Sequence, residues 1–305
     1  MKKRLLTLSA TILLAGCSTY QEVSSDENTR VITTEQAGHL ELNKEIKRPV
    51  LFRAADPLNA ELLGVEPVGV NSQLKGSELV EEKLDATFIE PGDFETVESL
   101  NPDLIVTYAP DEYSATYRDY APTIEMRYIT SAFNPYKKRI YLTHFYYLGV
   151  MLNKEEEAKL IADEFLEKMS TLRSQLDHQV LDMNAAVIVD EDDTYYLRPK
   201  FSSFGTEAVY DVLGFSQPKY IKRILESDDY KIYETEDYSA AKLDYLFVAT
   251  DDVNNENKKE ALAKAFNINV EQVIFMNIDN FRPNDLQSIE FQSKELIETL
   301  NKLNH

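Results

Sequence analysis

Short hydrophobic runs alternate with amphipathic stretches along residues 48–108. The runs predict buried strands at 49–52, 65–70 and 103–108, and the stretches between them predict helices at 57–63 and 93–100. This alternation is typical of an α/β domain with a mainly parallel sheet, in which ligands bind at the carboxyl ends of the strands.

A longer amphipathic stretch then interrupts the alternation. Asn153 can cap a helix there, the acidic residues 155–157 suit its positive end, and apolar residues recur every three or four positions at Ala158, Ile161, Phe165, Met169, Leu172 and Leu176. A helix of this length spans about 36 Å, which is enough to cross a domain. We therefore expect it to connect two lobes.

The alternation resumes in the second half of the chain. Hydrophobic runs predict strands at 185–189, 195–197, 245–249 and 273–278, with helices at 206–213 and 285–303. The halves also share a spacing, because Glu95 precedes Asp103 by eight residues and Glu236 precedes Asp244 by eight. The sequence thus predicts an N-terminal lobe at 48–152, a connecting helix at 153–180 and a C-terminal lobe at 181–305, with a cleft between the lobes.

The N-terminus predicts export. Residues 1–16 combine a basic start with a short apolar run, and Ala15-Gly16 directly precedes Cys17, the only cysteine of the chain. The segment Leu14–Cys17 resembles a bacterial lipobox, which implies that Cys17 is lipidated and becomes the mature N-terminus; an ordinary signal peptide with an incidental cysteine is the alternative. Residues 18–30 are polar and aperiodic and predict a flexible tether within a lead-in over 17–47.

Composition narrows the function classes. The 305 residues include 53 acidic and 32 basic side chains, a net charge of −21, which argues against a partner nucleic acid because phosphate binding needs clustered Lys and Arg. A lone cysteine excludes an intramolecular disulfide. A secreted enzyme is a weaker alternative, since the sequence has no Gly-x-Ser-x-Gly, His-Glu-x-x-His or phosphate-binding glycine loop.

Five ordered stretches carry a family resemblance: 61–70, 94–106, 120–124, 148–158 and 204–214. They resemble the substrate-binding lipoproteins of bacterial ABC importers for Fe(III)-siderophores, and among these the ferric-hydroxamate and ferric-citrate branch. The resemblance implies two α/β lobes joined by a helix that permits small closure, and no enzymatic activity or cofactor. It also implies a monomer on the outer face of the cytoplasmic membrane, as in a Gram-positive bacterium, that delivers its ligand to a permease of two transmembrane subunits with an ATPase.

The resemblance also assigns the site residues. Eight positions are expected to line the cleft: Arg53, Tyr108, Arg127, Tyr128, Tyr196, Arg198, Phe281 and Arg282. One carboxylate per lobe, Glu95 and Glu236, is implied to pair with arginines of the permease.

The arginines predict the charge of the ligand. Guanidinium groups bind carboxylates bidentately and stay charged at physiological pH, so we expect an anionic chelate: a citrate-containing or mixed citrate–hydroxamate siderophore, or ferric citrate. A haem- or cobalamin-binding lipoprotein of the same fold is the alternative. The histidines, His39, His144, His178 and His305, show no metal-ligand spacing, so we expect no metal bound directly by the protein. The aromatic residues Tyr136, Tyr141 and 145–147 have helical spacing and predict the packing face of a helix before the connector.

Overall fold

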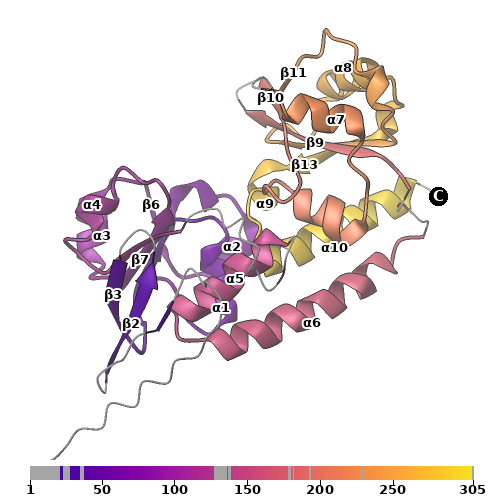
Figure 1. Ribbon diagram of the computed structural model, residues 1–305. Coiled ribbons are helices and arrows are strands. Elements are labelled where there is room, and N and C mark those ends of the chain that lie inside the picture. Colours follow the sequence, from indigo (N-terminus) through magenta and orange to yellow (C-terminus); the bar gives the residue numbers. More distant parts are fainter. Residues whose placement is uncertain are drawn as a thin grey trace, which may run out of the picture.

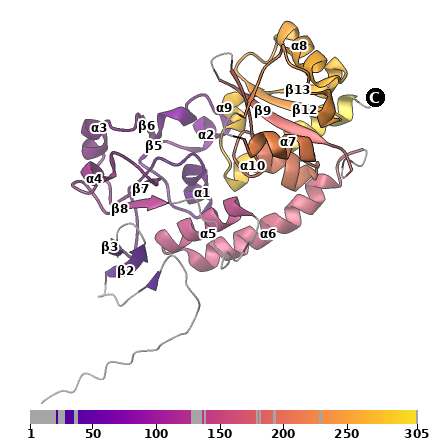
Figure 2. The same ribbon diagram turned by 45° about the horizontal axis from the view of Figure 1, so that its top comes forward.

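The protein consists of two α/β lobes side by side, with one long helix running along both (Figures 1 and 2). The computed structural model describes residues 21–22, 28–34, 38–126, 136, 139–177, 180, 182–191, 194–227 and 230–303. Within these residues, every helix is too short or too polar to cross a membrane.

The N-terminal lobe is built on a parallel five-stranded sheet. Its strand order is β6 (Thr87–Ile89), β5 (Gly69–Asn71), β4 (Pro49–Leu51), β7 (Leu104–Tyr108) and β8 (Thr123–Met126). The connections carry α1 (Asp56–Leu62), η1 (Ser72–Leu74), α2 (Glu78–Lys83), α3 (Phe94–Ser99) and α4 (Ser114–Tyr117). Strand β5 starts later than predicted, after Pro67, which has no N–H to donate to a ladder.

The C-terminal lobe has a mixed sheet. The order is β11 (Lys231–Ile232), β10 (Thr194–Leu197), β9 (Ala185–Glu191), β12 (Tyr245–Thr250) and β13 (Val273–Asn277). Strands β9, β12 and β13 are parallel, β10 is antiparallel to β9, and β11 is antiparallel to β10. Around it lie η2 (Ala208–Leu213, a π-helix), α7 (Lys219–Leu225), η3 (Ser239–Ala241), α8 (Glu256–Phe266), η4 (Val270–Gln272), α9 (Ile278–Phe281) and α10 (Leu286–Leu303).

The two lobes start their central strands in the same way. The Asp103 carboxylate, just before β7, accepts hydrogen bonds from the backbone N–H of Lys47 at 2.7 Å and of Arg48 at 2.9 Å. The Asp244 carboxylate, just before β12, accepts one from the Asn184 N–H at 2.6 Å. Each aspartate therefore ties the start of one central strand to the start of its neighbour.

Helix α6 connects the lobes, and helix α5 precedes it in the N-terminal lobe. Helix α5 (Ile140–Met151) buries Tyr141, Phe145 and Tyr147, as the aromatic spacing predicts. Helix α6 (Glu155–Arg173) is shorter than predicted, and its N-cap residue is Lys154. Asn153 instead has a left-handed backbone, φ 60°, and forms the turn between the helices.

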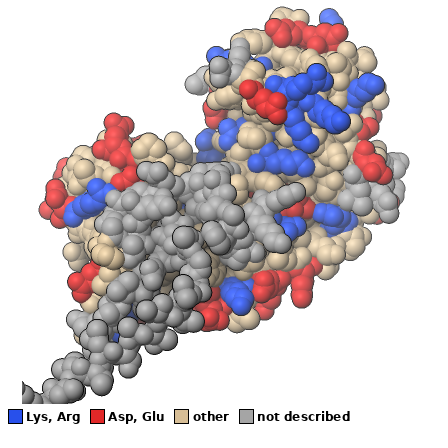
Figure 3. Space-filling model, viewed as in Figure 1, with Lys and Arg blue, Asp and Glu red and all other residues tan. Residues whose placement is uncertain are grey.

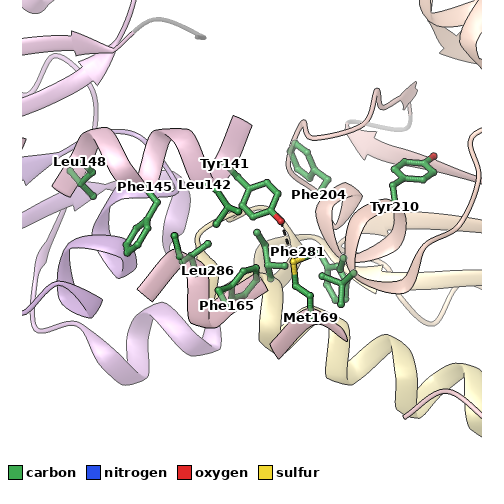
Figure 4. Packing of buried hydrophobic residues seen from close by; sticks show 14 of the residues in the cluster. Tyr141, Leu142, Phe145, Leu148, Phe165, Met169, Phe204, Tyr210, Phe281 and Leu286 are labelled. Carbon is green, nitrogen blue, oxygen red and sulfur yellow. Dashed lines mark hydrogen bonds between the residues drawn. The ribbon is translucent and has the colours of Figure 1, made fainter. Parts of the chain in front are cut away.

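One hydrophobic cluster extends through both lobes (Figure 4). It includes Leu51 and Leu148 of the N-terminal lobe, Phe165 of α6, and Phe281 and Leu286 of the C-terminal lobe. Polar contacts follow the same path: the Leu286 N–H donates to Asn59 Oδ1 at 3.2 Å.

The predicted tether over 18–30 is only partly correct. Strand β2 (Thr29–Thr34) pairs with β3 (Gly38–Asn43), and β1 (Gln21–Glu22) pairs with β2 in a small antiparallel sheet. The cause is the run of β-branched residues in β2 and the burial of Ile32 and Leu42 against the main core. The signal segment and Cys17 lie outside the described residues.

Candidate functional site

The first group of predicted site residues lies at the ends of β4 and β7. Arg53 follows β4 and is buried, and its Nη1 donates to Asp56 Oδ1 at 3.0 Å in a buried ion pair. The Tyr108 ring, 52% exposed at the end of β7, lies over this guanidinium at 5.4 Å from its Cζ. The N-terminal lobe therefore presents Tyr108 to solvent and keeps Arg53 beneath it.

His144 belongs to the same group. Arg53 Nη2 donates to His144 Nδ1 at 2.9 Å, which requires an unprotonated Nδ1 and hence a neutral ring. Burial lowers the pKa of His144 well below its ordinary value, and the charge of Arg53 acts in the same direction. His144 is thus a neutral support for Arg53, with 7% of its surface exposed.

The second group surrounds Phe204 in the C-terminal lobe. The Cζ of Arg198 lies 4.8 Å from the centre of the Phe204 ring, and the Cζ of Arg282 lies 5.2 Å from it. Both distances are within the range of a cation–π contact. Because β10 is antiparallel to β9, Arg198 follows β10 at the end of the sheet where β9 begins, and its side chain reaches Phe204 from there.

The charge of Arg282 is not neutralised in the described part of the chain. No described carboxylate pairs with it, and its buried Nε has no hydrogen-bond partner among the described residues. Arg198 donates to the backbone carbonyl of Ser202 at 2.6 Å. Two guanidinium groups therefore converge on one aromatic ring.

Tyr196 contacts Tyr230 and Lys231 and packs against the edge of the main hydrophobic cluster. Its ring is 6.0 Å from that of Tyr230, and Lys231 Nζ is 5.8 Å from its centre. Phe281 is fully buried, next to Gly205, so its side chain packs in the core and does not reach the surface. Arg127 and Tyr128 lie outside the described residues.

The predicted docking residues are both exposed. Glu95 lies in the first turn of α3, which Asp93 caps by accepting from the Thr96 N–H at 3.1 Å. Glu236 accepts from the Tyr238 hydroxyl at 3.0 Å and lines a hollow of about 890 Å³ with Glu234, Asp237 and Lys264. This hollow lies around η3 and α8, away from the Phe204 group.

Sequence reasoning missed Phe204 as a site residue, although it assigned both arginines beside it. Phe204 has a left-handed backbone, φ 55°, and so do its neighbours Phe201 and Ser203. Non-glycine residues in this conformation are uncommon and cluster at functional sites. The triplet Phe204-Gly205-Thr206 was the available signal, since glycine is favoured in such a turn.

Metal-binding chemistry is not apparent in the described residues, where no three His, Cys, Asp or Glu side chains are grouped as metal ligands.

In the view of Figure 3, Lys and Arg side chains gather over the C-terminal lobe, although the chain as a whole is strongly acidic.

Comparisons with solved structures identify the fold. The FhuD protein from S. pseudintermedius is 21% identical, with a TM-score of 0.75 over 91% of this chain and 99% of its own. FhuD2 from Staphylococcus aureus with bound ferrioxamine B is 22% identical, with a TM-score of 0.71 over 85% and 100%. The petrobactin-binding protein YclQ from Bacillus subtilis is 17% identical, with a TM-score of 0.66 over 90% and 99%.

The scan against family models and the search of curated proteins gave no match. The structural likeness nevertheless extends over both lobes and over nearly the whole length of each neighbour. It confirms the predicted two-lobe α/β architecture with its connecting helix. The chain therefore has the FhuD fold.

Proposed function

We propose that this protein is the extracytoplasmic substrate-binding component of an ABC importer and binds an anionic Fe(III) chelate between its lobes. The ligand class is a citrate-containing or mixed citrate–hydroxamate siderophore, or ferric citrate itself. The observation that carries the proposal is the convergence of Arg198 and Arg282 on Phe204, in a fold that includes a ferrioxamine B complex and a petrobactin-binding protein.

Charge supports an anionic ligand. Guanidinium groups form short bidentate hydrogen bonds with carboxylates, and Arg282 has no carboxylate partner in the described residues. A positive site on an acidic protein attracts an anionic complex and repels a bare cation. Arg53 contributes less to this field, since Asp56 neutralises it, and we assign it the role of supporting Tyr108.

The surroundings of His144 favour a siderophore over haem. An axial haem ligand needs an accessible imidazole nitrogen, whereas Nδ1 of His144 accepts from Arg53 and the residue is almost fully buried. Haem and cobalamin remain as comparison ligands in the test.

The same proposal covers the membrane attachment and the partner. Cys17 carries the lipid that holds the protein on the outer face of the cytoplasmic membrane, and two or more acyl chains give stable anchoring. Glu95 and Glu236 contact a permease of two transmembrane subunits, which works with an ATPase. Labelling of the full chain with radioactive palmitate, and its loss in Cys17→Ser, tests the anchor.

Ligand titration tests the binding function. The chain has 18 tyrosines and no tryptophan, so tyrosine fluorescence reports binding at Tyr108 and its neighbours. Ferric citrate and a mixed citrate–hydroxamate chelate are expected to quench it, whereas iron-free citrate, haem and cobalamin leave it nearly unchanged. Absence of a response to every carboxylate-containing chelate would overturn the proposal.

A further inference from the structure

The turn that carries Phe204 is conformationally strained. Phe201, Ser203 and Phe204 have φ values of 62°, 68° and 55°, and Gly205 follows with 81°. Non-glycine residues rarely adopt this conformation, and it persists only where the surrounding structure holds it. The position of Phe204 between Arg198 and Arg282 therefore requires support from neighbouring groups.

Glu207 provides that support from inside the lobe. It is fully buried, and its Oε1 accepts from the Ser203 N–H at 3.3 Å and from Asn284 Nδ2 at 2.9 Å. Ser203 precedes Phe204, and Asn284 follows Arg282 by two residues. One carboxyl group thus joins the strained turn to the loop that carries Arg282.

The second carboxyl oxygen of Glu207 contacts the same turn through Thr206. Thr206 Oγ1 accepts from the Ser202 N–H at 2.9 Å and lies 2.9 Å from both Ser203 O and Glu207 Oε2. The hydroxyl has one hydrogen, which it can donate to either of these two oxygens. Both oxygens of Glu207 are therefore in hydrogen-bond contact with the residues of the strained turn.

Burial makes these contacts necessary. Burial raises the pKa of Glu207, and no cation pairs with its carboxyl among the residues that the structure describes. The hydrogen bonds with Asn284, Thr206 and the Ser203 N–H act on the pKa in the opposite direction, so they are the contacts that compensate for the burial of this group.

We infer that Glu207 is a positioning residue: a buried, hydrogen-bonded bridge that fixes Phe204 and Arg282 relative to each other and so sets the spacing of the two guanidinium groups. The identity of the ligand that uses this spacing rests on the proposed function. The bridge itself rests on the contacts of Glu207 alone.

The test compares Glu207→Ala and Glu207→Gln with Asp190→Ala. Gln keeps a carbonyl oxygen that can accept from the Ser203 N–H and from Asn284, and it has the same length as Glu. Asp190 is a buried carboxylate of the same lobe, bonded to Lys258 and Thr250 at 2.9 and 3.1 Å, and touches neither the turn nor the Arg282 loop. It is the matched control for general destabilisation.

The first readout needs no ligand. Hydrogen exchange over 201–206 and 282–287 is expected to be at least about fivefold faster in Glu207→Ala than in the wild type, near wild type in Glu207→Gln, and unchanged in Asp190→Ala. Exchange that stays slow in Glu207→Ala, or rises equally in Asp190→Ala, overturns the bridge whether or not the protein binds a chelate.

The second readout is affinity for ferric citrate. Glu207→Ala is expected to weaken it about tenfold or more, Glu207→Gln by less than about threefold, and Asp190→Ala by less than about twofold. In an Arg282→Ala background the effect of Glu207→Ala should largely disappear, since both changes act on the same contact. Full additivity contradicts the inference. Failure of the wild type to bind ferric citrate contradicts the proposed function instead, and the exchange experiment still decides on Glu207.

Discussion

Arg53 donates a hydrogen bond to the Nδ1 atom of His144 across 2.9 Å, from the end of a strand to the middle of a helix. The bond joins β4 to α5 beneath Tyr108, and it is possible only while His144 is neutral. Protonation of the ring would place two positive charges in contact within a buried site, which is strongly unfavourable.

Acidification is therefore expected to destabilise the protein through His144. Its pKa is lowered in the folded state, so between about pH 6.5 and the folded value only the unfolded chain takes up this proton, and the free energy of unfolding falls by about 1.4 kcal/mol per pH unit. His144→Asn, whose Oδ1 can accept from Arg53, should lack this contribution. Urea unfolding at pH 7, 6 and 5 measures the slope. The same substitution at the exposed His39, His39→Asn, serves as the control. The prediction is contradicted if the free energy of unfolding of His144→Asn depends on pH as steeply as that of the wild type.

Asp285 is expected to act in the opposite direction. It is fully buried at the start of α10 and accepts from the Ser288 N–H at 2.8 Å, and burial raises its pKa to about 6. Between about pH 4 and 6 the folded state keeps a proton that the unfolded chain releases, so stability falls by about 3 kcal/mol as the pH rises through this range.

The substitution Asp285→Asn isolates the contribution of Asp285 to the pH dependence of the stability. Asn is an equally good N-cap and carries no charge, so the variant should gain about 3 kcal/mol relative to wild type between pH 4 and 7. Denaturant unfolding at both pH values, read as the difference between the two proteins, cancels the contributions of other groups. If the difference in free energy of unfolding between the two proteins is the same at both pH values, ionisation of Asp285 does not lower the stability and the prediction is wrong.

Removal of the cleft arginines should discriminate between ligands by charge. Arg198→Gln and Arg282→Gln are each expected to weaken ferric citrate binding about tenfold or more, and to change the affinity for a neutral ferric hydroxamate by less than about threefold. Arg223→Gln, an exposed arginine of α7 in the same lobe, is the control. Equal losses for both chelates would indicate a packing role for the arginines.

The docking glutamates should separate binding from uptake. Glu95→Gln and Glu236→Gln are expected to leave chelate affinity within about twofold and to lower uptake of labelled iron at least about tenfold, because each removes one charge from a permease contact. Glu98→Gln, on the same exposed helix as Glu95, controls for loss of surface charge alone. Uptake at the wild-type rate in both variants would show that docking uses other residues.

Much of the fold could be predicted from sequence because buried parallel strands are continuous hydrophobic runs. Residues 103–108 and 245–249 illustrate this and became β7 and β12. Short or half-exposed strands such as β6 and β11 carry too few apolar residues to be seen, and the charged helix α8 lacks a distinctive pattern at its start. The Asn153 turn was mistaken for a cap because Asn suits both positions.

The sequence was enough to predict which residues belong to the candidate site, but not how they are arranged in space. Motif positions assigned Arg198 and Arg282, but their meeting at Phe204 depends on an antiparallel β10 and on a left-handed turn, neither of which has a reliable local signal. Phe281 had the same aromatic character as a cleft residue, and only tertiary packing against Gly205 places it in the core.

The apolar cluster that passes from Leu51 through Phe165 to Leu286 makes the two lobes one cooperative folding unit. Severing the chain between α6 and β9 would expose part of that cluster on each fragment, so neither lobe should be stable when expressed alone. Equilibrium unfolding of the intact protein should accordingly show a single transition, and ligand added to the native state should raise the stability of both lobes together.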